Sequence, residues 1–251
     1  MKHRLDILMT EKGLAKSRTS AAQLIKEGSV AVNGVTAKKP SELYDDNDDI
    51  AVSESSELTK YVGRGGLKLE TAIESFGISP RGCVCLDIGA STGGFTDCML
   101  QGGALRVYAV DVGTGQLDPR LREDSRVISL ENTDIRIVGD SMIPEKVQFV
   151  TCDVSFISLS AVLPEIKRFA ADGAVCAVLI KPQFELGRTK IGKSGVVRDP
   201  RLHEKVVRDI TALAASLGFT DIKTVPSKIT GGDGNKEFLM HCVFKGEKSD
   251  R

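Results

Sequence analysis

A strand-like apolar run that leads directly into a loop of small residues constrains this chain most. Residues 84–88 read Val-Cys-Leu-Asp-Ile, and residues 89–94 read Gly-Ala-Ser-Thr-Gly-Gly before a helical pattern begins at Phe95. Glycine lets the backbone pass close to a ligand and adopt a positive φ, and the free N–H groups of a helix start favour an electronegative ligand. The pattern predicts a strand, a ligand-binding turn and a helix N-terminus.

This turn departs from the dinucleotide-binding pattern. Ser91 stands where Gly-x-Gly-x-x-Gly has its second glycine, the position at which a pyrophosphate approaches the backbone. The serine side chain therefore disfavours NAD. For this stretch taken alone, a tight turn that binds no ligand is the alternative.

Bulk composition indicates the class of protein. The 251 residues are 41% hydrophobic and 27% charged, which is typical of a globular protein of one or two domains. No apolar run reaches the ~20 residues of a membrane span, and the charged start of the chain lacks a signal-peptide pattern. Six cysteines include no C-x-x-C pair, which argues against a disulfide framework or a metal site. We expect a cytoplasmic protein without metal or membrane contact.

Strand and helix patterns alternate after residue 60. This alternation predicts a parallel, doubly wound sheet, and two final strands close it with an antiparallel hairpin. The fold class we expect is α/β, a seven-stranded Rossmann-like S-adenosylmethionine (SAM) methyltransferase domain preceded by a small α+β domain. Expected strands are 84–88, 107–111, 127–130, 147–152, 174–180, 219–225 and 237–244, and expected helices are 67–76, 95–101, 159–170 and 201–217.

The first 50 residues read as two short helices and a hairpin that turns at Asn33-Gly34. The stretches that carry a resemblance are Arg-Leu-Asp at 4–6, Ser-Arg-Thr-Ser-Ala-Ala-Gln-Leu-Ile at 17–25 and Gly-Ser-Val-Ala-Val-Asn-Gly at 28–34. They resemble the αL RNA-binding domain of a small-subunit ribosomal protein, pseudouridine synthases and bacterial tyrosyl-tRNA synthetases. A solvated basic helix is the alternative. The resemblance implies RNA contacts by Arg4, Lys16, Arg18, Gln23 and Lys26.

Charges balance over the chain but are uneven along it. Residues 1–40 carry eight Lys/Arg against three Asp/Glu, and residues 41–60 carry one against seven. Residues 181–208 again carry eight against three, and clustered positive charge of this kind indicates a polyanionic partner. The expected domains are 1–53 for RNA binding, a linker at 54–60, a methyltransferase domain at 61–246 and a tail at 247–251.

Acidic residues stand at the carboxyl ends of the expected strands, where open α/β sheets bind ligands. Asp111, about 20 residues beyond the turn, can accept hydrogen bonds from a ribose diol. Asp134 is placed for an adenine amino group, and Asp87 for holding the turn or the amino-acid part of a cofactor. These residues predict an adenosyl cofactor, but they do not distinguish SAM from NAD. Candidate cofactor residues are Asp87, Gly89, Ser91, Gly93, Gly94, Phe95, Asp111, Val112, Asp134 and Asp153.

Two lysines and two acids are expected to meet in one crevice. Asp153 and Lys181 follow neighbouring strands, and Lys68 and Glu237 complete the group. A buried lysine loses its proton more readily, and a neutral amine can accept a proton from a sugar hydroxyl. An ordinary ion pair is the alternative for each residue alone.

Several longer motifs resemble the TlyA, or hemolysin A, family. They are Tyr-Val-Gly-Arg-Gly-Gly-Leu-Lys-Leu at 61–69, the stretches 86–97 and 108–117, Asp-Val-Ser-Phe-Ile-Ser at 153–158 and Lys-Pro-Gln-Phe-Glu at 181–185. The part after residue 60 is also similar to the FtsJ (RrmJ) ribose methyltransferases. Their Lys-Asp-Lys-Glu tetrad matches, without departure, the catalytic candidates Lys68, Asp153, Lys181 and Glu237.

This resemblance implies SAM-dependent 2′-O-methylation of ribosomal RNA, typically at cytidine, by direct displacement without a metal. It implies that Lys181 activates the 2′-hydroxyl, that Asp153 and Glu237 orient the lysines, and that Lys68 positions the ribose and phosphate. Ribosomal RNA or ribosomal subunits would be the partner of a monomer or weak dimer. Arg188 and Lys190 belong to a basic loop after the fifth strand, which we expect to guide the RNA backbone; a solvated loop is the alternative. Arg64 is a further expected RNA contact.

Three other functions are weighed against this one. A non-catalytic RNA-binding factor is disfavoured by the intact tetrad, and an NAD enzyme by Ser91 and the terminal hairpin. A membrane-acting hemolysin is the remote alternative, since the sequence has no span or lytic helix.

Overall fold

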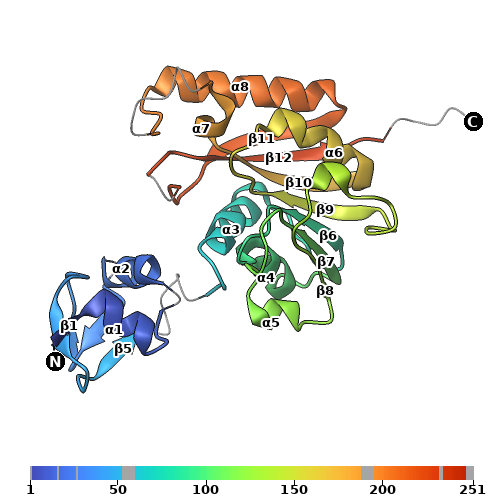
Figure 1. The fold of residues 1–251 in the computed structure, drawn as a ribbon. Coiled ribbons are helices and arrows are strands. Elements are labelled where there is room, and N and C mark those ends of the chain that lie inside the picture. The colour runs from blue at the N-terminus through green and yellow to red at the C-terminus, as the bar shows by residue number, and fades with distance from the viewer. Residues whose placement is uncertain are drawn as a thin grey trace, which may run out of the picture. The chain divides into compact units, whose positions relative to one another are not determined.

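The computed structural model describes residues 2–15, 17–26, 28–52, 60–187, 195–231 and 234–246. The chain divides into two compact units, Met1–Lys60 and Tyr61–Arg251 (Figure 1). Residues 54–59 of the expected linker and the expected tail at 247–251 lie outside the described residues.

The N-terminal unit packs two helices against short strands. Its hairpin turns at Asn33-Gly34, where Val32 pairs with Val35 and both turn residues have a positive φ. Leu5, Leu8 and Ile25 lie in its buried core. Its elements are β1 (Lys2–Arg4), α1 (Leu5–Glu11), α2 (Arg18–Lys26), β2 (Val30–Val32), β3 (Val35–Thr36), β4 (Leu43–Asp45) and β5 (Ile50–Val52), with sheets β3-β2-β5 and β1-β4.

The small β1-β4 sheet is not expected from the sequence. Lys2 pairs with Asp45 and Arg4 with Leu43 in antiparallel register. Each strand has only three residues, too few for a strand period to appear, so their pairing depends on the tertiary fold.

The larger unit is built on one seven-stranded sheet with helices on both faces. Helices α3 and α4 lie on one side of it, and α6 and α8 lie on the other (Figure 1). Its elements are α3 (Gly65–Phe76), β6 (Val84–Ile88), α4 (Gly94–Gln101), β7 (Arg106–Val110), α5 (Pro119–Arg122), β8 (Val127–Leu130), a 3₁₀ turn η2 (Ile135–Ile137), β9 (Val147–Cys152), a 3₁₀ turn η3 (Leu159–Ala161), α6 (Leu163–Phe169), β10 (Ala170–Ile180), α7 (Pro182–Glu185), α8 (Pro200–Ser216), β11 (Phe219–Pro226) and β12 (Phe238–Phe244).

The strand order is β11-β12-β10-β9-β6-β7-β8. Strands β10, β9, β6, β7 and β8 pair in parallel, while β12 runs antiparallel between β10 and β11. The expected doubly wound sheet with a terminal antiparallel hairpin is thereby confirmed. The chain leaves β6 toward β7 and returns to β9 on its other side, which opens a crevice at their carboxyl ends.

One expected helix is wrong in its bounds. The stretch 159–170 divides into η3 and α6, because Pro164 occupies the first turn of a new helix at Leu163. Ala170 then pairs with Val147, so β10 begins four residues before the expected strand. A register shift between Ala170 and Val175, where Gly173 has a φ of 79°, absorbs the irregular residues.

Candidate active site

The turn after β6 is shaped by close backbone packing. Gly89 has a φ of 84°, and a Cβ placed there would lie 2.4 Å from the Asp153 carbonyl oxygen. Only glycine therefore lets the ends of β6 and β9 approach this closely. The backbone N–H groups of Ser91 and Gly113 donate to the two carboxylate oxygens of Asp111, at 2.8 and 2.7 Å. Asp111 thus ties the turn to the end of β7, with a further lone pair on each oxygen.

A cavity of about 540 Å³ opens beside this turn at the carboxyl ends of the strands. Asp134 lies on its wall, where Arg136 pairs with the carboxylate at 2.5 Å and lowers its pKa. The size suits an adenosyl ligand. Residues from four strand ends and the turn line it, among them Gly89, Ser91, Asp111, Val112, Gly113, Asp134, Arg136, Asp153, Ser155 and Phe156.

The four catalytic candidates form one alternating chain of charges. Glu237 Oε2 accepts from Lys68 Nζ at 2.6 Å, and the same Nζ lies 3.9 Å from Asp153 Oδ2. The other Asp153 oxygen, Oδ1, lies 2.6 Å from Lys181 Nζ. Side chains of Lys68, Lys181 and Glu237 are only 11%, 10% and 2% exposed. Two cations and two anions balance, which is how buried charges are tolerated.

Four different elements deliver these side chains. Lys68 comes from the first turns of α3, whose start packs on the turn because Gly66 and Gly94 approach each other closely. Asp153 and Lys181 directly follow β9 and β10, and Glu237 directly precedes β12. Since β12 is antiparallel, its first residues lie at the same edge as the ends of the parallel strands.

A second, polar cavity of about 240 Å³ contains both lysines. It shares Gly89, Ser91, Asp153 and Ser155 with the larger cavity, so the two adjoin at Asp153. Its other lining residues are Arg64, Gly65, Lys68, Ala90, Thr92, Gly94, Phe95, Lys181 and Thr230.

Two of the cofactor candidates lie beneath the turn rather than on a cavity wall. Asp87 is fully buried and accepts hydrogen bonds from the hydroxyls of Thr96 at 2.6 Å and Thr151 at 2.8 Å. Burial raises its pKa to about 6. Gly93 caps α4 with a φ of 95°, and a Cβ there would meet Leu121.

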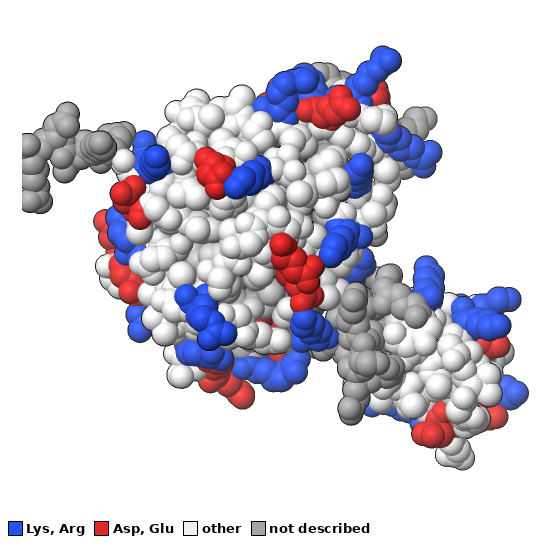
Figure 2. Space-filling model, turned by 180° about the vertical axis from the view of Figure 1, so that it is seen from behind, with Lys and Arg blue, Asp and Glu red and all other residues white. Residues whose placement is uncertain are grey.

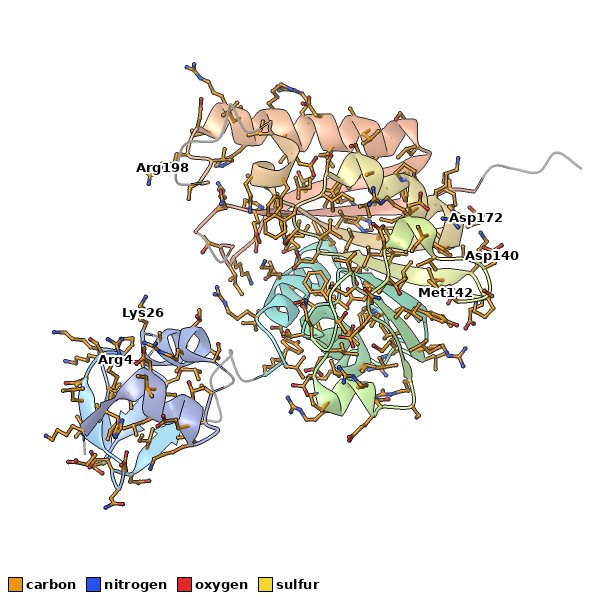
Figure 3. All side chains as sticks on the ribbon, in the orientation of Figure 1. Arg4, Lys26, Asp140, Met142, Asp172 and Arg198 are labelled. Atoms are coloured by element: carbon orange, nitrogen blue, oxygen red, sulfur yellow. The ribbon has the colours of Figure 1, made fainter. Side chains whose placement is uncertain are left out.

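The expected RNA contacts are divided between the described and the undescribed residues. Arg4, Arg18 and Lys26 belong to the N-terminal unit, and Figure 3 shows Arg4 and Lys26 on it. Arg64 lines the smaller cavity. Lys16, Arg188, Lys190 and the side chain of Gln23 lie outside the described residues. On the face shown in Figure 2, Lys and Arg are interspersed with Asp and Glu over the larger unit.

The structure adds residues that sequence reasoning did not place in the site. Ser155 Oγ accepts a hydrogen bond from Lys181 Nζ at 2.9 Å. Phe156 is 91% exposed with a φ of 65°, and its ring lies 5.0 Å from that of Phe184. Glu185 accepts from the Ser158 hydroxyl and so holds the same loop. The motif at 153–158 was a signal for this loop, but not for which side chain touches Lys181.

Among the described residues, no group of His, Cys, Asp and Glu is arranged to hold a metal ion. Within the same part of the chain, no helix is long and apolar enough to cross a membrane.

Comparison with known proteins agrees with this architecture. A family model for FtsJ-like methyltransferases matches residues 61–244, and a model for the S4 domain matches residues 3–50. The 16S/23S rRNA (cytidine-2′-O)-methyltransferase TlyA of Mycobacterium tuberculosis is 42% identical, covering 94% of this chain and 88% of its own. Hemolysin A of Brachyspira hyodysenteriae is 40% identical, over 96% of this chain and 100% of its own. A solved structure from Streptococcus thermophilus that carries a hemolysin name superposes with a TM-score of 0.77 at 43% identity, covering 98% of this chain and 90% of that one.

Fold and family match together define an α/β methyltransferase that carries an S4 domain at its N-terminus. The resemblance stated from the sequence motifs is confirmed. The chain belongs to the FtsJ-like methyltransferase family, in the TlyA and hemolysin A group of that family.

Proposed function

We propose that this protein uses SAM to methylate the ribose 2′-hydroxyl of a cytidine in ribosomal RNA. The observation that carries the proposal is the adjacency of two cavities. One has the size and acidic strand ends of an adenosyl site, and the other holds Lys68 and Lys181. Asp153, Ser155 and the Gly89 turn form their common wall. A nucleoside cofactor in the larger cavity and a sugar hydroxyl in the smaller one would both lie beside Asp153.

The residues present fit SAM in the larger cavity. Asp111 keeps lone pairs for the ribose hydroxyls, and Val112 adds an exposed apolar side chain for the adenine. Asp134 and the turn residues Gly89 and Ser91 complete the proposed cofactor contacts. Bound SAM supplies an electrophilic methyl group on a sulfonium.

Lys181 is the proposed proton acceptor for the 2′-hydroxyl. Its Nζ is held by Asp153 at 2.6 Å and by Ser155 at 2.9 Å, so its position is determined before substrate binds. If the Lys181 ammonium first releases a proton to solvent, the resulting neutral amine can take the proton of the 2′-hydroxyl. Lys68, held by Glu237 at 2.6 Å, is proposed to position the ribose and its phosphate. Such pre-positioning lowers the cost of bringing the hydroxyl into line.

The N-terminal domain, proposed as residues 1–53, supplies affinity for the RNA backbone through Arg4, Arg18 and Lys26. Arg64 in the smaller cavity is the proposed contact nearest the reacting ribose. Contacts to phosphate orient a substrate more than they select its sequence. A cytoplasmic location is part of this proposal, and ribosomal subunits are the proposed partner.

Cofactor-binding, methyl-transfer, mapping and lysis assays test this proposal. The purified protein is expected to bind SAM and not NAD in calorimetry, and to transfer a tritiated methyl group from SAM to ribosomal RNA. Mapping 2′-O-methyl sites in ribosomal RNA from cells with and without the gene then identifies the nucleotide. RNA binding without transfer would instead indicate a non-catalytic RNA-binding factor. Lysis of protein-free liposomes by the purified chain would favour the hemolysin alternative.

A further inference from the structure

A buried carboxylate in the N-terminal unit is shared by two arginines. Asp6, in the first turn of α1, is only 4% exposed. Its Oδ1 accepts from Arg4 Nε at 2.9 Å, and its Oδ2 accepts from Arg4 Nη2 at 3.0 Å and from Arg18 Nη2 at 3.1 Å. The pKa of Asp6 is lowered, first because Arg4 donates to it.

The two arginines come from different elements and remain half exposed. Arg4 ends β1 and Arg18 begins α2, and their side chains are 42% and 59% exposed. Two guanidinium groups against one carboxylate leave a net positive charge. Three bonds to Asp6 use only part of the N–H groups that two guanidinium groups offer, so donors remain for an anion.

We propose that Asp6 is a positioning residue that holds Arg4 and Arg18 side by side as one fork for an RNA phosphate. This inference rests on the proposed RNA-binding function. An arginine loses rotamer freedom when it binds, and a partner that already fixes one edge of its guanidinium group removes that cost. A planar guanidinium held in this way presents its outer edge to phosphate oxygens in a defined plane.

For the affinity of the protein for RNA, the inference predicts the opposite of what net charge alone predicts. Removing an acid from an RNA-binding surface should tighten RNA binding, because repulsion is lost. If Asp6 acts through the arginines, Asp6→Asn should weaken RNA binding, because the amide has one acceptor oxygen where the carboxylate has two. The matched control is Glu11→Gln, which removes the same charge from an exposed position on the same helix.

The experiment measures affinity of the full chain for in-vitro transcribed 16S and 23S ribosomal RNA at several salt concentrations. We expect Asp6→Asn to bind RNA about 10-fold more weakly, because Arg4 and Arg18 would then lose their rotamer freedom only when RNA binds. We expect Glu11→Gln to bind equally or up to about 2-fold more tightly. The slope of log affinity against log salt should fall by about one for Asp6→Asn, as for a lost phosphate contact.

A double-mutant cycle separates positioning from a structural role. In a variant that carries both Arg4→Ala and Arg18→Ala, Asp6→Asn should cost no further affinity. A further loss there would mean that Asp6 only maintains the fold, and would overturn the inference, as would Asp6→Asn binding as tightly as wild type. If both arginine substitutions leave RNA binding unchanged, the proposed RNA contacts of this domain fail instead.

A second variant keeps the test decisive if Asp6→Asn unfolds. Arg4→Lys keeps the charge but cannot make the two parallel bonds to Asp6. We expect this variant to stay folded and to bind RNA several-fold more weakly, because one oriented phosphate contact is lost. Wild-type affinity for Arg4→Lys would contradict the fork.

Discussion

Replacing Lys181 with methionine tests the proposed chemistry most directly. Methionine keeps an unbranched stem of similar length but removes the amine, which lies 2.6 Å from Asp153 and 2.9 Å from Ser155. Loss of a general base costs about 10²–10⁴ in rate. Loss of the positioned partner for the hydroxyl adds to this, so we expect kcat to fall at least about 10³-fold, or about 4 kcal/mol.

The fold and the cofactor site should survive this change. Asp153 loses its nearer cation but keeps Lys68 at 3.9 Å, so the destabilisation should stay below the roughly 3–5 kcal/mol of a fully orphaned buried charge. Lys181 lines the smaller cavity, whereas the adenosyl ligand is assigned to the larger one. We expect the Kd for SAM to change by less than about 3-fold, under 1 kcal/mol.

The assay is multiple-turnover transfer of tritiated methyl to ribosomal RNA, with calorimetry for SAM binding and urea unfolding for stability. The control is Lys205→Met, which removes an exposed lysine paired with Asp209 on α8 and should leave kcat unchanged. A Lys181→Met enzyme within tenfold of wild-type kcat would refute the assignment of Lys181 as proton acceptor.

Three further predictions concern the turn and its neighbours. The pKa of Asp87 is raised to about 6, so its ionisation opposes folding; this cost is absent below about pH 4 and complete above about pH 6. Between pH 4 and pH 7, the free energy of unfolding of Asp87→Asn, measured in urea, should therefore rise by up to about 3 kcal/mol relative to that of wild type. Gly89→Ala would place a Cβ 2.4 Å from the Asp153 carbonyl oxygen, so calorimetry should show lost SAM binding, with a destabilisation of about 2–5 kcal/mol in urea unfolding. Ser155→Ala removes a hydrogen-bond acceptor of Lys181 and should lower kcat about 10-fold at unchanged KM in methyl-transfer assays.

Two of these predictions have a matched control variant. Gly115 also has a positive φ, at 66°, but open space for a Cβ, so Gly115→Ala should show only the strain of about 1–2 kcal/mol and keep SAM binding. Equal behaviour of the two glycine variants would contradict the close-packing argument. Ser155→Thr keeps the hydroxyl and should restore most of kcat. A difference between Asp87→Asn and wild type that does not grow with pH would contradict the raised pKa.

Much of the fold is predictable because it follows from local periodicity. The strands 84–88, 127–130 and 147–152 have the bounds expected from their apolar runs, since a buried parallel strand is apolar on both faces. The division of 159–170 was missed because the helical period is continuous across Pro164, and only packing decides where the turn ends. The three-residue strands β1 and β4 were missed because neither carries a period.

The candidate site is likewise predictable only in part from the sequence. Chain order and residue type alone place Asp111, Asp134, Asp153 and Lys181 after their strands, because the ends of parallel strands share one edge of the sheet. Tertiary structure decides which of these charges meet. Lys68 and Glu237, separated by 169 positions, form a 2.6 Å pair because α3 packs on the turn and β12 runs antiparallel.

The turn after β6 was recognisable as a candidate ligand site from its glycines and the helix that follows. The sequence could not show that Asp87 lies buried beneath it, or that Ser155 holds Lys181. Nor could it show that Arg4 and Arg18 share Asp6. Local pattern determines which residues reach an edge or a surface, but hydrogen-bond partners are chosen by distances that arise only when separate elements pack.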